Sequence, residues 1–336
     1  MKKCGKIGIV GLGLIGGSIA IALSGSYEIV GMSRNPDTVR YALENGIIDR
    51  AVSSYSEFIG LDAVIVCTPL SLVKKTVEDL YEALGDSVII TDVGSVKGML
   101  SGLPGRIVGG HPMAGTEQSG IRAAKERLLE NAYYILVDYK DNPRDLDFMK
   151  NLVLACGAVP IIMTADEHDK LVAKISHLEH MAAYSLVNSA MTGDEEIVGS
   201  GFMDTTRIAS SSPEFWATVA KLNKDNLLAE MDKYIETLNL LKEDIEKDAD
   251  IIPTLTKAKQ RRDALGYKRR YMTSYVVYVD VPDCVGSIVG VLAKLSDNGV
   301  SINNLTVMNS REGVGGALRI ELKDERGYKK AKEIFG

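Results

Sequence analysis

The sequence predicts an α/β protein in three parts: a doubly wound N-terminal domain (residues 1–164), a helical domain (165–272) and a small α+β domain (273–336). Three observations carry this prediction. A glycine-rich turn joins an apolar strand to a helix near the N-terminus, and short β-branched runs then alternate with amphipathic stretches up to about Met163. Beyond Ala165 the strand signals disappear, and they return only near residue 275.

The first element is an apolar strand over residues 7–10, which runs through Gly11-Leu12-Gly13-Leu14-Ile15-Gly16 into a helix. Gly11 permits a tight turn, Gly13 lets the backbone approach a pyrophosphate, and Gly16 lets helix and strand pack closely. Free N–H groups at the helix start, at Leu14 and Ile15, face the anion. Glycines also occur in turns for steric reasons alone. The position between a strand and a helix favours a Rossmann-type dinucleotide site.

The same segment has a second interpretation, because Lys2 and Lys3 precede an apolar stretch as in a secretory signal peptide. Glycines interrupt that stretch, and its removal would delete the first strand of the sheet. We therefore expect a cytoplasmic protein.

The later strands of the sheet are expected at residues 28–32, 63–67, 87–91, 106–109, 132–137 and 159–163. Ligands of a doubly wound sheet bind at the carboxyl ends of its strands. Long helical periods follow over residues 170–191, 213–248 and 252–265. The stretch 173–190 is apolar over much of its circumference, which favours burial in a bundle or in a homodimer interface.

The C-terminal part reads as strand 275–281, helix 287–297, strands 300–309 and 316–322, and a last helix from Arg326. This βαββα order suggests a split βαβ module that is one strand short of the complete pattern.

Composition excludes several classes of function. The formal net charge is -6 without a sustained basic run, so neither nucleic acid nor an anionic membrane is an expected partner. No other run approaches the roughly 20 apolar residues of a membrane helix. Four scattered cysteines, at positions 4, 67, 156 and 284, give no metal-ligand spacing, and no metal is expected.

Two candidate site clusters follow predicted strands. Thr91-Asp92-Val93-Gly94-Ser95-Val96-Lys97 offers a hydroxyl that can meet cofactor and substrate, although helix capping would also explain Ser95. In Gly109-Gly110-His111-Pro112-Met113-Ala114-Gly115-Thr116-Glu117, we expect His111 in a loop after a strand. An imidazole there can exchange a proton near neutral pH.

A third cluster is divided between Ser176-His177-Leu178-Glu179-His180 and the segment 201–207. His177 and His180 share a helix face, but no matching Cys or carboxylate supports a metal site. Arg207, followed by Trp216, suits carboxylate recognition, and an ion pair with Asp204 is the equally supported alternative.

The end of the second strand bears on cofactor choice. An acidic residue there usually selects NAD, whereas this chain has Ser33 and Arg34, which can accept a 2′-phosphate. The pattern favours NADP modestly. The alternative is that Arg34 stacks on adenine while the protein uses NAD.

Five motifs in order resemble the prephenate dehydrogenase family: Gly-Leu-Gly-Leu-Ile-Gly-Gly-Ser from Gly11, Thr-Asp-Val-Gly-Ser-Val-Lys from Thr91, Gly-Gly-His-Pro-Met-Ala-Gly-Thr from Gly109, Ser-His-Leu-Glu-His from Ser176, and Gly-Phe-Met-Asp-Thr-Thr-Arg-Ile-Ala-Ser-Ser from Gly201. The tail, with Val-Pro-Asp-Cys-Val-Gly-Ser from Val281, resembles an ACT domain, an amino-acid-binding module. Two positions depart from the family pattern: Glu179, where relatives often carry Pro, and Met203, where they often carry Arg.

The resemblance implies oxidative decarboxylation of prephenate to 4-hydroxyphenylpyruvate in tyrosine biosynthesis, with hydride transfer to NAD or NADP. It implies that His111 accepts the hydroxyl proton, that Ser95 orients His111 and the nicotinamide, and that Arg207 grips a substrate carboxylate. The remaining implied residues are His180, Glu117, Asp204, Thr206 and Trp216 around the substrate, and Gly11, Gly13, Leu14, Ile15, Gly16, Ser33, Arg34, Thr68 and Ser95 around the cofactor. Lys97 is a weaker companion, and for His177 a local hydrogen bond is the preferred interpretation.

Tyrosine feedback through Asp283, Gly286, Asn303 and Asn304 is a further hypothesis. Three alternatives stay open. The same scaffold can act on arogenate and give tyrosine directly. A 3-hydroxyacid dehydrogenase would need a lysine base, for which only Lys170 and Lys174 lie nearby. A non-catalytic dinucleotide and amino-acid sensor would have no need for His111 with Arg207.

Overall fold

The protein was analysed as a computed structural model, which describes residues 3–115, 118–190, 197–268, 275–282, 284–311 and 315–335. The chain divides into two compact units, residues 1–238 and 239–336.

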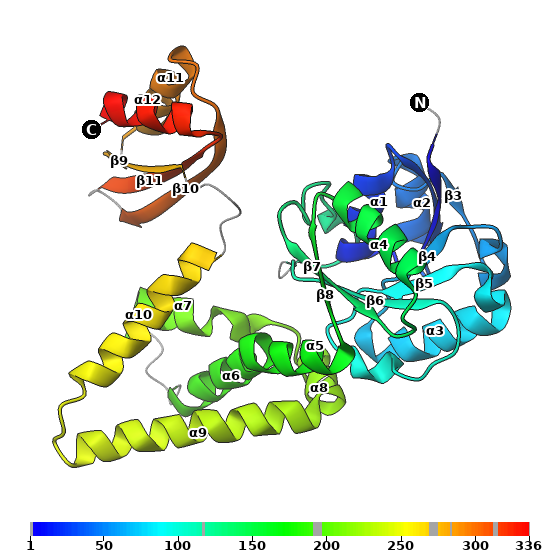
Figure 1. The fold of residues 1–336 in the computed structure, drawn as a ribbon, viewed down its shortest axis with the longest axis horizontal. Coiled ribbons are helices and arrows are strands. Elements are labelled where there is room, and N and C mark those ends of the chain that lie inside the picture. The colour runs from blue at the N-terminus through cyan, green and yellow to red at the C-terminus, as the bar shows by residue number, and fades with distance from the viewer. Residues whose placement is uncertain are drawn as a thin grey trace. The chain divides into compact units, whose positions relative to one another are not determined.

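The first unit is built on a sheet of eight strands, shown in blue to green in Figure 1. The strands are β1 (Gly5–Val10), β2 (Tyr27–Met32), β3 (Arg50–Ala51), β4 (Ala63–Val66), β5 (Ile89–Asp92), β6 (Ile107–Pro112), β7 (Tyr133–Asp138) and β8 (Val159–Met163). Their spatial order is β3-β2-β1-β4-β5-β6-β7-β8. All pairs are parallel except β6 with β7, which is antiparallel. The seven strands that the sequence predicts are all present, and the short edge strand β3 is an addition.

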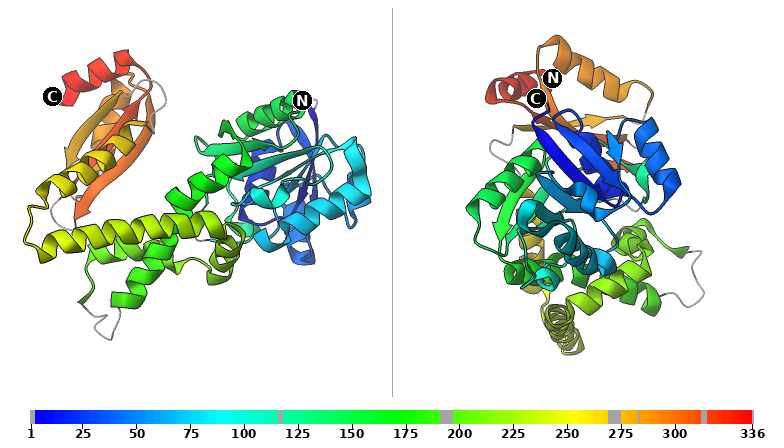
Figure 2. Two further views of the ribbon diagram at one scale, coloured as in Figure 1. Left: turned by 60° about the horizontal axis from the view of Figure 1, so that its bottom comes forward. Right: turned by 90° about the vertical axis from the view of Figure 1, so that its right-hand side faces the viewer.

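Helices cover both faces of the sheet, as Figures 1 and 2 show. They are α1 (Leu14–Leu23), α2 (Pro36–Glu44), α3 (Leu70–Leu84) and α4 (Pro143–Ala155). Alternate strand residues point into different cores: Ile7 and Ile9 pack with α1 and α4, whereas Val64 and Val66 pack with α3. This division confirms the doubly wound arrangement.

The rest of the first unit is helical. Its elements are α5 (Ala165–Val172), a π-helical turn (Ala173–His177), α6 (Leu178–Ala190), α7 (Ser200–Thr206), α8 (Pro213–Leu222) and the start of α9 (Lys224–Glu246). The sequence predicts one helix over 213–248, and this prediction is wrong at Asn223. That residue leaves the helical conformation (φ -115°, ψ 34°), and its buried side chain donates to the backbone oxygen of Asp169 over 2.7 Å. The break therefore fixes α8 and α9 against α5.

The second unit contains α10 (Ile252–Lys268), β9 (Val276–Val281), α11 (Ser287–Asp297), β10 (Ile302–Arg311), β11 (Gly315–Leu322) and α12 (Glu325–Phe335). The strands form an antiparallel sheet in the order β10-β11-β9, and a core that includes Leu295, Leu318 and Ile320 lies between this sheet and its helices (Figure 1). The βαββα order follows the prediction for this part of the chain.

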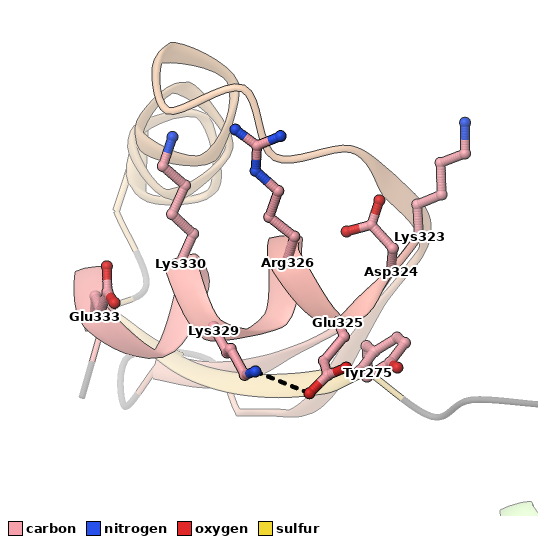
Figure 3. A pocket seen from close by; sticks show the side chains of 8 residues that line it. All are labelled: Tyr275, Lys323, Asp324, Glu325, Arg326, Lys329, Lys330 and Glu333. Atoms are coloured by element: carbon pink, nitrogen blue, oxygen red, sulfur yellow. Dashed lines mark ion pairs between the residues drawn. The ribbon is translucent and has the colours of Figure 1, made fainter.

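An open pocket in the second unit is lined mainly by charged side chains of α12 and the turn before it (Figure 3). Lys329 pairs there with Glu325 over 2.9 Å. The residues hypothesised to bind tyrosine lie elsewhere in this unit: Gly286 precedes α11 with φ +92°, and Asn303 and Asn304 belong to β10. Asp283 lies outside the described residues.

None of the helices in the described part of the chain is both long enough and apolar enough to cross a membrane.

Candidate active site

The glycine turn has the geometry of an anion cradle. Gly11 adopts φ +101°, and a Cβ atom on Gly16 would lie 2.1 Å from the Gly11 carbonyl oxygen, so both positions require glycine. A Cβ on Gly13 would meet nothing within 4 Å. Gly13 is the N-cap residue of α1 and offers no side chain to bond the first N–H groups of the helix. The first turn contains no acidic residue. The helix N-terminus is therefore open to a pyrophosphate.

Three hydroxyl oxygens in or just after strands β4 and β5 are buried, and the backbone of one of these residues, Thr68, lies beside the glycine turn. Thr68 follows β4, Thr91 is in β5, and Ser95 follows β5. Within the described residues, none of these three hydroxyl oxygens has a hydrogen-bond partner. A buried polar group without a partner costs free energy unless a ligand satisfies it. Thr91 is fully buried inside β5, but Thr68 and Ser95 are only half-buried, so these two hydroxyls, together with the open turn, fit a bound dinucleotide.

The end of β2 presents Ser33, which is half-buried, and Arg34, which is exposed. Asn35 caps α2 by accepting a bond from the Asp37 N–H over 2.9 Å, which holds the turn in place. The position at which an acidic residue would bind a ribose hydroxyl is therefore occupied by a hydroxyl and a guanidinium.

His111 is the centre of the acid–base part of the site. The expectation that it lies in a loop is wrong, because β6 continues to Pro112 and His111 pairs with Ile135 of β7. The antiparallel neighbour extends the ladder beyond the expected strand end. Burial, reinforced by the neighbouring His168, Lys97 and His177, lowers the pKa of His111 well below its ordinary value of 6.5. The imidazole is therefore neutral at neutral pH.

His168 and Asp169, which sequence analysis missed, support His111 from α5. His111 Nδ1 lies 2.8 Å from His168 Nε2, and His168 Nδ1 lies 2.7 Å from Asp169 Oδ1. Although burial alone would raise the pKa of Asp169, hydrogen bonds from His168 and from the N–H groups of Lys97 and Gly98 hold it below its ordinary value. The available signal was a His-Asp pair one turn into a well-capped helix.

Lys97 contacts both Asp169 of α5 and the strand β6 that carries His111. Its ammonium is fully buried, pairs with the carboxylate of Asp92 and donates to the Gly110 carbonyl over 2.6 Å. Burial lowers the pKa of Lys97, and the Asp92 carboxylate opposes that shift. Because Gly110 precedes His111, the Lys97 side chain fixes the strand that carries the imidazole. The sequence predicts Lys97 only as a weak companion of Arg207, whereas in the structure it holds the strand that carries His111.

His177 belongs to the π-helical turn and is fully buried. Its Nδ1 lies 3.2 Å from the side-chain amide nitrogen of Asn223, so its hydrogen bond is to a residue at the end of α8. Its Nε2 has no hydrogen-bond partner among the described residues. π-Helical turns often occur at functional sites.

His180 stacks on Trp216 with ring centroids 3.6 Å apart, and its Nδ1 lies 3.0 Å from the Ser176 carbonyl oxygen. Burial and the positive charge of Arg207 lower the pKa of His180, against the raising effect of the bond to Ser176. Arg207 lies at the start of a 3-10 turn and is exposed. The structure therefore brings His180, Trp216 and Arg207 together.

The remaining predicted residues are less informative. Thr206 is buried and bonds the Phe202 carbonyl within its own helix, Asp204 is exposed, and Glu117 lies outside the described residues. Among the described residues, no three His, Cys, Asp or Glu side chains gather as metal ligands would.

A doubly wound sheet, an open glycine turn and a neutral imidazole at the carboxyl edge define a dinucleotide-binding protein with an acid–base site. The comparisons with known proteins identify the family. The model of the prephenate dehydrogenase nucleotide-binding domain matches residues 20–162, and that of the prephenate dehydrogenase dimerization domain matches residues 164–257. The chain belongs to the prephenate dehydrogenase family.

Individual relatives agree with this assignment. Prephenate dehydrogenase from Bacillus subtilis (strain 168) is 35% identical, over 97% of this chain and 94% of the relative. A crystal structure of prephenate dehydrogenase from A. aeolicus, in complex with hydroxyphenyl propionate and NAD+, is 32% identical with a TM-score of 0.71, over 79% of this chain and 99% of that one. Synechocystis arogenate dehydrogenase is 31% identical with a TM-score of 0.67, over 79% of this chain and 100% of that one.

Proposed function

We propose that this protein oxidises and decarboxylates prephenate to 4-hydroxyphenylpyruvate, with a nicotinamide dinucleotide as the hydride acceptor. The observation that carries the proposal is the neutral, hydrogen-bonded imidazole of His111 at the carboxyl edge of the sheet. Family membership supplies the substrate. Arogenate is the second candidate, which the likeness to Synechocystis arogenate dehydrogenase favours.

The chemistry assigns a task to each group. Prephenate carries a ring hydroxyl and a ring carboxylate on opposite carbons. Removal of hydride from the hydroxyl-bearing carbon begins a carbonyl, His111 takes the hydroxyl proton, and the carboxylate leaves as carbon dioxide. The electrons of the broken C–C bond complete the aromatic ring as a phenolate, whose oxygen then takes a proton back to give the phenol and leaves His111 neutral again. A bound nicotinamide supplies the acceptor for the hydride.

Ser95 and Thr68 are proposed to bind the dinucleotide, which would satisfy their buried hydroxyls. Its pyrophosphate would lie on the turn Gly11–Gly16, at the N–H groups of Leu14 and Ile15. We further propose that Ser33 and Arg34 allow a 2′-phosphate, so that NADP serves as well as NAD.

Arg207 is proposed to bind a substrate carboxylate, because a dianion would be costly to enclose without a cation. The His180–Trp216 stack would form a wall of the same pocket, since the charge of Arg207 already acts on His180. Glu117, Asp204 and Thr206 are proposed to support this side of the site.

Two larger-scale proposals accompany the activity. The second matched family model describes a dimerization domain, and α9 exposes Leu228, Ile235 and Leu238 on one face, which supports a homodimer through the helical part. The C-terminal unit is proposed to be an ACT-like domain that binds tyrosine near Asp283, Gly286, Asn303 and Asn304.

The test is a matrix of prephenate and arogenate against NAD and NADP, followed by nucleotide absorbance, with and without tyrosine. We expect turnover of prephenate, and a loss of about 10²-fold or more for His111→Asn, which keeps polarity but does not accept the proton. Lys221→Gln, at an exposed residue near the end of α8 to which no role is assigned, is the control. No turnover in any combination would point to a sensor. Unchanged activity and no binding at high tyrosine would remove the feedback proposal.

A further inference from the structure

We propose that Asp169 and His168 form a hydrogen-bond relay that fixes the tautomer of His111, with the proton on Nδ1 and the proton-accepting lone pair on Nε2. His168 and Asp169 are thus positioning residues, since they act through His111. The inference deepens the proposed function and rests on it only for the direction in which the proton moves.

The carboxylate of Asp169 can only accept hydrogen bonds. It accepts the Lys97 N–H on Oδ1 over 2.8 Å and the Gly98 N–H on Oδ2 over 2.7 Å. His168 Nδ1 lies 2.7 Å from Oδ1, so this nitrogen must be the donor. The carboxylate thus determines the state of the first imidazole.

The state of His168 in turn determines which nitrogen of His111 carries the proton. A neutral histidine carries one N–H, so His168 Nε2 is left as an acceptor. His111 Nδ1, at 2.8 Å from that nitrogen, must then donate. The free lone pair of His111 is therefore on Nε2, which has no such neighbour among the hydrogen bonds of the described residues.

The relay depends on His168 being neutral. If both of its nitrogens carried protons, His111 Nδ1 would have to accept, and His111 Nε2 would carry the proton instead. Burial and the charge of Lys97 lower the pKa of His168, against the raising effect of Asp169 and Asp92. At neutral pH His168 is therefore neutral, and its Nε2 remains the acceptor for the His111 Nδ1 proton.

One loop holds both ends of the relay. The backbone of Lys97 and Gly98 binds Asp169, while the Lys97 ammonium binds the carbonyl of Gly110 next to His111. The Tyr139 hydroxyl also donates to the Lys97 carbonyl over 2.8 Å. Neither end of the relay can shift without disturbing this loop, which makes it a rigid support for a proton acceptor.

The test is ¹⁵N NMR of the imidazoles in the full-length protein, which has four histidines in all and so allows assignment by single substitutions. We expect His111 and His168 both to carry their proton on Nδ1 at neutral pH. A proton on Nε2 of His111 would overturn the proposal. This measurement needs no turnover, so it remains decisive if no substrate is found.

A matched pair of variants separates positioning from packing. In His168→Gln the side-chain carbonyl can still accept from His111 Nδ1, whereas His168→Leu offers no acceptor. We expect the Leu variant to lose the single His111 tautomer and to lower kcat by roughly 10²-fold or more, with an unchanged KM for the dinucleotide, and the Gln variant to retain both the tautomer and most of kcat. Equal activity in the two variants would contradict the relay. If the Leu variant does not fold, the Gln variant is compared with the unsubstituted protein. Loss of the Nδ1-protonated tautomer of His111 in the Gln variant would then contradict the relay.

Discussion

At the scale of single residues, burial favours the neutral form of the imidazoles in this site, although carboxylates as well as cations lie near them. Burial lowers the pKa of His111, His168, His177 and His180, and Lys97 or Arg207 reinforces the effect at three of them. A neutral imidazole can accept a proton, and nearby cations favour an acidic substrate. The neutral form is the one that the proposed proton transfer to His111 requires.

Arg207 gives the first prediction at this scale. Arg207→Gln removes the guanidinium, so we expect KM for prephenate to rise by about tenfold or more, while kcat at saturation falls less. The pKa of His180 should also rise, because the charge that lowers it is gone. Steady-state kinetics and NMR titration of His180 check the two effects. Lys221→Gln, at an exposed residue near the end of α8, is the control, and an unchanged KM for Arg207→Gln would exclude the carboxylate role.

The sequence predicted some of these residues and not others for a physical reason. His111, Ser95 and Arg207 stand in motifs with distinctive neighbours, whereas His168 is separated from His111 by 57 residues and is adjacent only to an ordinary helical acid. Its role arises from a contact between α5 and β6. The sequence holds only the adjacent His-Asp pair as a sign of this role, because a long-range contact leaves no fixed spacing between His111 and His168.

At the scale of elements, the strand, turn and helix at the N-terminus show how one segment divides its tasks among three glycines. Gly11 and Gly16 are required by the fold, since a Cβ on either would meet backbone atoms. Gly13 is not required by the fold, because its surroundings are open. Under the proposed function, glycine at position 13 leaves room for the pyrophosphate to approach the backbone.

This difference gives a prediction about two variants. Gly16→Ala should destabilise the protein by about 1–3 kcal/mol through overpacking, and it should weaken dinucleotide binding as well. Gly13→Ala should leave the urea midpoint unchanged but raise the dissociation constant for NAD and NADP by about tenfold. Gly25→Ala, which also meets nothing within 4 Å, is the control for both. If Gly13→Ala binds dinucleotide normally, the pyrophosphate does not approach this turn.

Element boundaries were predicted less well than element types. The expected strand 106–109 continues to Pro112, because Gly109–Pro112 pair with β7. The expected helix 213–248 breaks at Asn223, whose side chain is needed by Asp169 and His177. In both cases a partner from elsewhere in the chain overrides the local pattern. Both deviations lie at the site itself.

At the scale of the whole molecule, alternating apolar runs and glycine punctuation were sufficient to predict the doubly wound sheet and the helical region. The antiparallel strand β7 was not predicted as antiparallel, since its apolar run reads the same in either direction. The ACT-like nature of the C-terminal unit stays a prediction. Its three-stranded sheet and βαββα order are compatible with that module but not specific to it.

The buried histidines together predict how stability depends on pH. A histidine with a folded-state pKa below its unfolded value of about 6.5 is neutral in both states above that pH. Below it, the unfolded chain takes up a proton that the folded chain does not, so stability falls as the pH drops. Burial lowers the pKa of His177 to about 4, which corresponds to a loss of up to about 3 kcal/mol by pH 4.

We therefore expect the urea midpoint of the first unit to fall steadily between pH 6.5 and pH 5, as followed by fluorescence of Trp216, the single tryptophan. Trp216 contacts both His177 and His180, so it reports on the region that titrates. Glu179, whose pKa burial raises, acts in the opposite direction, but its ordinary value of 4.5 places most of its effect at the acid end of this window. His177→Gln removes one titrating group and should flatten the pH dependence relative to the unsubstituted protein. A midpoint that does not change between pH 7 and pH 5 would mean that these imidazoles take up protons as readily in the folded chain as in the unfolded one, and the neutral state assigned to His111 would be lost with them.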